Sequence, residues 1–121
     1  MQIAQKNFYK KFLGRAGEKR AVKFLKNNGF KILETNYKTT FGEIDIIAQE
    51  RDTIVFVEVK TRTSESYGRP SEAVDRKKQE RYYKTATYYL QRANKMESSC
   101  RFDIIEIENG KINHIFNAFG V

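Results

Sequence analysis

One stretch of the chain decides the fold: residues 42–60, which read GEIDIIAQERDTIVFVEVK. It contains two runs rich in β-branched residues, 42–48 and 53–60, joined by the polar segment 49–52. β-branched residues favour strands, and a short polar segment between two such runs favours a turn. The stretch therefore predicts an antiparallel β-hairpin.

The hairpin carries charged side chains where a buried sheet would have apolar ones. Side chains of a strand alternate between its two faces, so one face of the first strand should be purely apolar, formed by Ile44, Ile46 and Ala48. The other face holds Asp45, and in the second strand Glu58 and Lys60 share a face with apolar residues. Two carboxylates side by side repel each other, and a hard divalent ion such as Mg²⁺ removes the conflict by taking both as ligands.

Outward from the hairpin, hydrophobic periodicity and turn residues predict two helices and three further strands. The expected helices cover residues 10–28 and 70–93. The expected strands cover residues 30–37, 101–108 and 111–118. The last two strands meet at Asn109-Gly110, the dipeptide that most favours a type I′ hairpin turn.

This order predicts an α/β fold with a central five-stranded mixed sheet flanked by helices. The helix between the third and fourth strands permits a crossover, so that this pair of strands can run parallel. With 121 residues, one proline and no internal repeat, the chain is expected to form a single domain over residues 1–121. Residues 1–9 are expected to be a flexible N-terminal segment.

The amino-acid composition indicates which class of molecule the protein binds. The chain has 23 Lys and Arg against 15 Asp and Glu, for a formal net charge of +8, which favours a polyanion such as nucleic acid. No apolar run approaches the ~20 residues of a membrane span, and the N-terminus lacks the apolar centre of a signal peptide, so a cytoplasmic protein without a membrane partner is expected. Cys100 is the only cysteine and His114 the only histidine, which excludes an internal disulfide and a cysteine-based zinc site.

Each expected helix adds a polar residue to its apolar stripe. Glu18 lies about 60° from Ala21 around the first helix, inside the stripe that should face the sheet. Gln79 lies in the stripe of the second helix, four residues before Tyr83. Together with the charged residues of the hairpin, these side chains point from different elements toward one interior region.

Each of these residues also has a purely structural interpretation. Asp45, Glu58 and Lys60 could form a solvated sheet edge with a cross-strand salt bridge worth ~0–1 kcal/mol. Glu18 could pair with a Lys or Arg on the flank of its helix, and the polar pair of the second helix could be ordinary packing residues.

Two other residues, Glu43 and Asp103, also have both a structural and a functional interpretation. Glu43 is either an edge residue or an outer group of the site. Asp103 is either part of a strand-edge salt bridge or a wall of the site, and His114 is expected on the surface of its strand.

The spacing of the charged residues resembles a known superfamily. An aspartate at the end of one strand followed by Glu-x-Lys in the next, here Asp45 and Glu58-Val59-Lys60, resembles the PD-(D/E)XK nucleases, although Ile44 stands where their name has proline. Gln79-x-x-x-Tyr83 resembles the QxxxY motif of RecB-like members. Over residues 14–119 the chain looks like the bacterial YraN family, which resembles the archaeal Holliday junction resolvases and thus implies a restriction-endonuclease-like core. The matching segments are Gly17-Glu18, Gly29-Phe30, Asn36-Tyr37, residues 42–47 and 56–62, Lys77-Lys78-Gln79 and Arg101-Phe102-Asp103.

The resemblance implies roles for the matching residues. Asp45 and Glu58, with the Val59 carbonyl, would bind Mg²⁺ or Mn²⁺, and Lys60 would orient or activate the attacking water. The supporting residues would be Glu18 as a further metal ligand, direct or through water, Gln79 and Tyr83 as groups that hold the site or contact DNA, and Glu43. Independently of the resemblance, basic residues are available to meet DNA phosphates, namely Arg15, Arg62, Arg69, Lys77 and Lys78. The alternative for them is a solvated basic surface that keeps the protein soluble.

These roles imply a metal-dependent DNA endonuclease or exonuclease that hydrolyses phosphodiester bonds in repair or recombination. The alternative is a nucleic-acid-binding accessory module with a vestigial nuclease site. A homodimer is compatible with the resemblance, because a DNA junction has two-fold symmetry.

Overall fold

The computed structural model describes residues 3–62 and 75–120 and, within these ranges, the side chains from Gly14 onward. Five strands form one sheet in the order β1-β2-β3-β4-β5, in which β3 and β4 are parallel and the other neighbours antiparallel. The predicted α/β fold with a five-stranded mixed sheet is confirmed, and so is the parallel pair. In chain order the elements are α1 (Ile3–Asn27), β1 (Lys31–Lys38), β2 (Glu43–Glu50), β3 (Thr53–Arg62), α2 (Arg76–Arg92), β4 (Ser99–Glu108) and β5 (Lys111–Phe119).

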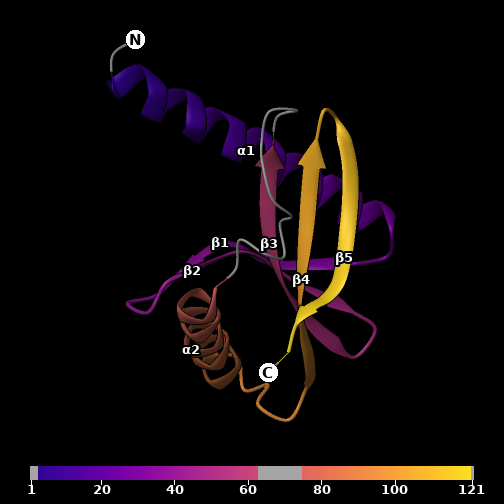
Figure 1. Ribbon diagram of the computed structural model, residues 1–121. Coiled ribbons are helices and arrows are strands. Elements are labelled where there is room, and N and C mark those ends of the chain that lie inside the picture. The colour runs from indigo at the N-terminus through magenta and orange to yellow at the C-terminus, as the bar shows by residue number, and fades with distance from the viewer. Residues whose placement is uncertain (1–2, 63–74, 121) are drawn as a thin grey trace.

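The two helices cover opposite faces of the sheet (Figure 1). Under α1 the core contains Ala21 and Leu25 together with β-branched residues of β2, β3 and β4. Under α2 it contains aromatic residues, among them Phe56, Tyr89 and Phe102. Burial of apolar surface on both faces, at about 25 cal/mol per Å², is the main stabilising contribution. Within the described residues, no helix is long and apolar enough to span a membrane.

The helix boundaries differ from the predicted ones. α1 begins at Ile3 rather than at residue 10, so it takes in most of the expected N-terminal segment. α2 begins at Arg76, and the start predicted at residues 70–71 lies outside the described residues. Asp75 caps α2, because its carboxylate accepts a hydrogen bond of 2.8 Å from the Lys78 N–H and lies at the positive end of the helix dipole.

The last hairpin has the predicted turn. Asn109 and Gly110 have φ angles of 50° and 80°, the left-handed conformations that both central residues of a type I′ turn adopt. This turn fixes the register of β4 against β5, with Glu108 opposite Lys111.

The ladder between β2 and β3 stops before the strands do. Its pairs run from Glu50 opposite Thr53 to Ile46 opposite Val57. Beyond that point β2 continues along β1 as far as Glu43, whereas β3 continues along β4 as far as Arg62. The sheet therefore opens between the two strands, and we call this opening the fork.

The fork changes the faces on which the β2 side chains lie. Regular alternation predicted that Ile44 shares a face with Ile46 and Ala48, and this prediction is wrong. Ile44 packs in the cluster under α2, whereas Ile46 and Ala48 pack under α1. The alternation breaks at Asp45, because β2 leaves its partner there, and the Asp45 carboxylate accepts a hydrogen bond of 2.9 Å from the Val59 N–H.

Candidate functional site

A pocket of about 250 Å³ lies at the mouth of the fork. β2 and β3 contribute carboxylates to it, and α2 contributes two cations and a phenol. We call it the acidic pocket; it is lined by Gly42, Glu43, Asp45, Glu58, Lys78, Arg81 and Tyr82.

Asp45 is held in an environment that disfavours its negative charge. Burial raises the pKa of Asp45 to about 8, and the charges of Glu58, Glu18 and Glu43 add to the shift. The hydrogen bond from the Val59 N–H acts in the opposite direction without cancelling it. A cation next to Asp45 would stabilise the ionised carboxylate.

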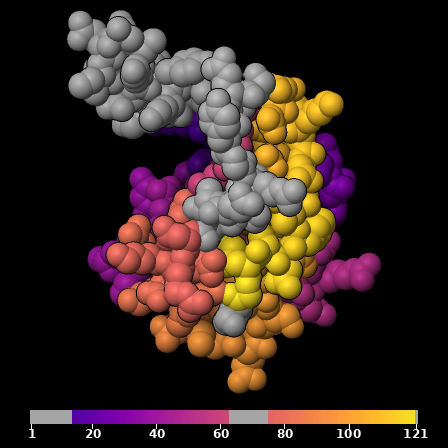
Figure 2. All heavy atoms as spheres, viewed as in Figure 1, coloured from indigo at the N-terminus to yellow at the C-terminus, as the bar shows by residue number. Residues whose placement is uncertain are grey.

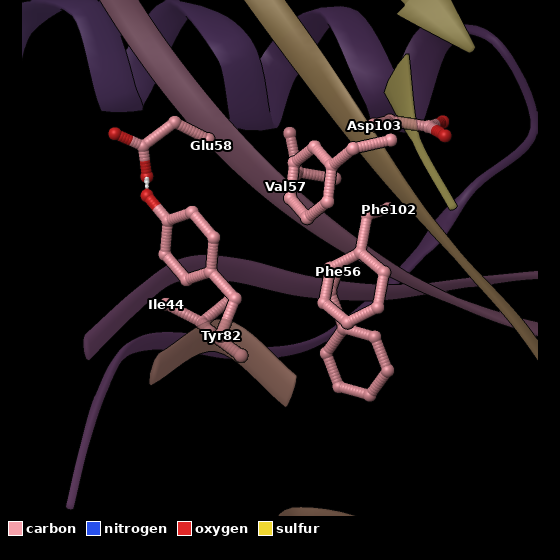
Figure 3. A pocket seen from close by; sticks show the side chains of 8 residues that line it. Ile44, Phe56, Val57, Glu58, Tyr82, Phe102 and Asp103 are labelled. Carbon is pink, nitrogen blue, oxygen red and sulfur yellow. Dashed lines mark hydrogen bonds between the residues drawn. The ribbon is translucent and has the colours of Figure 1, made fainter. Parts of the chain in front are cut away.

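Glu58 faces Asp45 across the fork, and both of its oxygens have partners. Lys60 Nζ and Lys78 Nζ lie 3.2 and 3.3 Å from Glu58 Oε1. The Tyr82 hydroxyl donates a hydrogen bond to Oε2, as Figure 3 shows at the edge of a neighbouring apolar pocket. Burial and the charge of Glu58 raise the pKa of Tyr82, so this phenol stays protonated and remains a donor.

The two lysines on Glu58 differ in their tendency to lose a proton. Burial and the neighbouring Lys78 lower the pKa of Lys60. Burial also disfavours the charged form of Lys78, but the hydrogen bond to Lys60 and the charge of Glu58 outweigh this effect and raise the pKa of Lys78. Lys60 is therefore the lysine that gives up its proton first.

Glu18 reaches the same group of acids from α1. Burial raises the pKa of Glu18, a hydrogen bond with Asn36 opposes the shift, and the charge of Glu43 adds to it. The approach of α1 to β3 depends on Gly17, since a Cβ at this position would overlap the Thr61 hydroxyl oxygen. Glycine at position 17 thus lets the helix lie close enough for Glu18 to act on the acids of the fork.

The structure brings five of the predicted site residues together and places others elsewhere. The five that act on one another at the fork are Glu18, Glu43, Asp45, Glu58 and Lys60. Tyr83 lies apart from Glu58, with its ring 5.3 Å from Phe102 and 6.3 Å from Phe119. Gln79 is half-buried on α2.

The residues predicted to contact DNA have different surroundings. Arg15 and Lys77 are exposed, and Arg62 is half-buried at the end of β3. Lys78 is paired with Glu58 rather than free on the surface. Arg69 lies outside the described residues.

Sequence reasoning missed the contact of α2 with Glu58. Lys78 and Tyr82 are four residues apart, so they lie on one face of the helix and reach the same carboxylate. Tyr82 belongs to the apolar stripe of this helix, next to Tyr83. The resemblance of Gln79-x-x-x-Tyr83 to the QxxxY motif pointed to Tyr83 instead.

A second buried acid lies outside the acidic pocket. The Asp103 side chain is 0% exposed and accepts hydrogen bonds from Arg101 Nε at 3.0 Å, His114 Nε2 at 2.8 Å and the Asn117 N–H at 2.9 Å. Its carboxylate points away from Glu58 in Figure 3. Burial would raise the pKa of Asp103, but the hydrogen bonds from His114 and Arg101 lower it. Asp103 is therefore an anion that stabilises the sheet on the α1 side.

The expectation that His114 lies on the surface is wrong. Its side chain is 6% exposed, with Phe24 and Phe30 at ring distances of 6.0 and 5.7 Å. The register of β5 against β4 shifts next to Asp103, and the end of α1 covers the imidazole.

The carboxylates of the fork fit a hard divalent cation. Within the described residues, no group of three or more His, Cys, Asp or Glu side chains is arranged to hold a metal ion. Mg²⁺ needs only one or two carboxylates, because waters and substrate phosphates complete its shell. Asp45 and Glu58 are such a pair, and the pKa of about 8 at Asp45 shows how poorly its charge is compensated by the protein alone.

Fold and pocket together define an α/β protein whose mixed sheet opens onto an acidic pocket flanked by lysines. A profile of the uncharacterised protein family UPF0102 matches residues 17–107. The chain belongs to this family, which is the YraN family that its motifs resemble. The matched residues include Glu18 and every residue that lines the acidic pocket.

Relatives share about half of their residues with this chain. The UPF0102 protein of Persephonella marina is 49% identical over 106 residues, which cover 88% of this chain and 91% of the relative. The UPF0102 protein of Caldanaerobacter subterraneus subsp. tengcongensis is 49% identical over 94% of this chain and 99% of its own length. That of Alkaliphilus oremlandii is 50% identical over 90% of this chain and 98% of its own length.

Proposed function

We propose that this protein is a metal-dependent nuclease that hydrolyses phosphodiester bonds in DNA. The observation that carries the proposal is the meeting of Asp45 and Glu58 across the fork, with Lys60 Nζ 3.2 Å from Glu58. The resemblance of Asp45 and Glu58-Val59-Lys60 to the PD-(D/E)XK motif supports the same chemistry.

Asp45 and Glu58, with the Val59 carbonyl, would hold Mg²⁺ or Mn²⁺. When bound, such an ion neutralises charge on the phosphate and lowers the pKa of a coordinated water. Lys78 lines the acidic pocket and shares Glu58 Oε1 with Lys60, so its ammonium group would compete with a bound metal ion for this oxygen.

Lys60 has the properties of a residue that handles a proton. Because its pKa is lowered by burial and by Lys78, the neutral amine forms more readily than in an exposed lysine. A neutral amine can take a proton from an attacking water, and the ammonium that results offsets negative charge on the phosphate. Tyr82 keeps Glu58 oriented while this happens, since its hydroxyl holds Oε2.

α2 supplies the positive charge that a phosphate backbone requires. Its 17 residues include six Lys or Arg and one acid, and Arg81 lines the acidic pocket next to Lys78. Binding that depends on such contacts weakens as salt concentration rises, because counterions are released from DNA.

Cleavage of labelled DNA substrates, with and without Mg²⁺ or Mn²⁺, tests the proposal. A branched junction, a duplex and a single strand should be compared, and at least one should give metal-dependent products. Asp45→Asn should reduce cleavage by about 100-fold or more, as expected for loss of a metal ligand. The matched control is Asp52→Asn, which changes an exposed acid in the turn between β2 and β3 and should leave cleavage unchanged. Cleavage by Asp45→Asn at the rate of the unaltered protein would refute the proposal.

A nucleic-acid-binding module without cleavage is the second candidate. One observation favours it: Lys60, Lys78 and Tyr82 already occupy both oxygens of Glu58. This candidate predicts salt-sensitive DNA binding and no metal-dependent products. Calorimetric titration of Mn²⁺ separates the two candidates. Binding that is lost in Glu58→Gln supports the nuclease, and no binding by either protein supports the module.

A further inference from the structure

A second pocket, of about 350 Å³, lies on the outer side of α2. Its rim carries two aromatic rings, Phe41 and Tyr88, which are 44% and 37% exposed. Figure 2 shows the outer side of α2, in salmon, uncovered on this face of the molecule. We call this pocket the aromatic groove; it is lined by Phe41, Tyr83, Lys84, Thr87, Tyr88 and Gln91.

The loop that carries Phe41 is fixed to α2. The Phe41 N–H donates a hydrogen bond of 3.1 Å to Thr39 Oγ1, which lies 3.3 Å from Thr85 Oγ1 on the helix. Next to Phe41, Gly42 approaches the helix so closely that a Cβ there would lie 3.4 Å from the Cβ of Arg81. The backbone at Phe41 is thus anchored, and its exposed ring is displayed from a defined position.

The aromatic groove adjoins the acidic pocket. Phe41 lines the groove and the next residue, Gly42, lines the pocket. On α2, Arg81 lines the pocket and Lys84 lines the groove. These two cations are three positions apart on the helix, about 4.5 Å along its axis at 1.5 Å per residue. A strand that is longer than the groove can therefore pass from it into the acidic pocket.

Cations accompany the aromatic rings. The guanidinium of Arg92 lies 5.6 Å from the centre of the Tyr88 ring, and Lys84 lies in the groove wall. An apolar peptide would use the rings but would gain nothing from this charge. A strand of nucleic acid uses both, because bases stack on aromatic rings while phosphates meet Lys and Arg.

We propose that the aromatic groove binds an unpaired base of a nucleic-acid strand, stacked on Phe41 and on the face of Tyr88 that Arg92 does not cover, with Lys84 at a flanking phosphate. A base within a duplex is already stacked on its neighbours and cannot offer its face to the rings. The groove therefore selects single-stranded or branched nucleic acid for the acidic pocket. The selection step rests on the proposed nuclease function, whereas the binding step does not.

Fluorescence anisotropy of a labelled single strand and of the matching duplex, measured in EDTA to prevent cleavage, tests the binding step. Phe41→Ala and Tyr88→Ala should each weaken single-strand binding about five- to tenfold, the lower range for loss of one stacking ring, and should affect the duplex less. Tyr88→Phe should retain the affinity, since it keeps the ring. The matched control is Phe116→Ala, which removes a 55% exposed ring from β5, outside the groove.

Four results would overturn the inference. The first two are the absence of single-strand binding by the unaltered protein and full single-strand affinity in both Phe41→Ala and Tyr88→Ala. The other two are equal weakening for strand and duplex, and a loss in Tyr88→Phe as large as in Tyr88→Ala. Circular dichroism melting of each variant verifies that binding changes do not come from unfolding.

The result of this binding test can be distinguished from the result of the cleavage test of the proposed function. Weak binding by Phe41→Ala together with full cleavage by Asp45→Asn would refute the nuclease site and keep the groove. Full binding by Phe41→Ala and Tyr88→Ala together with no cleavage by Asp45→Asn would refute the groove and support the nuclease site.

Discussion

Replacement of Asp103 by Asn should lower the free energy of unfolding by about 3 kcal/mol at neutral pH. Asp103 is fully buried and neutralises Arg101, whose Nε lies 3.0 Å from its carboxylate. Removal of one partner from a buried ion pair costs ~3–5 kcal/mol, because the other charge is left buried. Arg101 keeps Glu50 as an ion-pair partner at 3.0 Å, and the amide oxygen of Asn still accepts one hydrogen bond, such as that from the Asn117 N–H. The expected loss therefore lies at the lower end of this range.

The loss should depend on pH in a defined direction. Burial would raise the pKa of Asp103, but the hydrogen bonds from His114 and Arg101 outweigh it and hold this pKa below its ordinary value. The ionised carboxylate therefore contributes its full stability above the unfolded pKa of about 3.9, and the contribution is lost as pH falls through the lower pKa of the folded state. Urea unfolding of both proteins at pH 7 and near pH 3 should show the difference shrinking in acid.

Glu50 provides the control, because it pairs with the same Arg101 at 3.0 Å but is 36% exposed. Glu50→Gln should cost about 1 kcal/mol or less. A loss in Asp103→Asn as small as that of this control, or one that is the same at both pH values, would refute the assignment of Asp103 as a stabilising buried anion.

Three further sets of substitutions test the packing, and urea unfolding measures each. Gly17→Ala should lower the free energy of unfolding by ~1–2 kcal/mol, since the new Cβ would overlap the Thr61 hydroxyl. Gly14→Ala, whose Cβ would meet no atom within 4 Å, should raise it by up to ~1 kcal/mol. Equal effects of the two substitutions would contradict the close approach of α1. Leu25→Ala should cost ~3–5 kcal/mol because the side chain is fully buried, and a cost below about 1 kcal/mol would place it outside the core. Gly110→Ala should cost ~1 kcal/mol because φ is +80°, and unchanged stability would argue against the type I′ turn.

Local sequence signals were sufficient to predict the strands. Residues 42–60 form the predicted hairpin as β2 and β3, and the Asn109-Gly110 turn joins β4 to β5. The face of Ile44 was not predictable from alternation, because alternation assumes that a ladder continues to the end of the strand. The point at which β2 and β3 separate depends on their other neighbours in the sheet. The sequence of the hairpin contains no signal for it.

The candidate site was predictable as far as one hairpin defines it. Asp45 and Glu58 come together because each is the first residue beyond the last pair of the β2–β3 ladder, Ile46 opposite Val57. Lys60 follows two residues later on β3, with its Nζ 3.2 Å from Glu58. Tyr82 was missed in favour of Tyr83, since the angle around a helix does not decide which of two adjacent tyrosines reaches a carboxylate on the sheet. The burial of His114 had no local signal either, because it results from a register shift in β5 and from the end of α1 lying over it.

The fork leaves the sheet joined by the β2–β3 ladder at one end and open at the other. At the open end there are two hydrogen-bonded parts, which we call the leaves: β2 with β1, and β3 with β4 and β5. A twist of one leaf against the other would change the distance between Asp45 and Glu58, because the two acids lie on different leaves. The bond from the Val59 N–H to Asp45 spans the gap between the leaves. Hydrogen exchange of the Val59 amide therefore reports how often the leaves part, and occupancy of the gap by a cation should slow it.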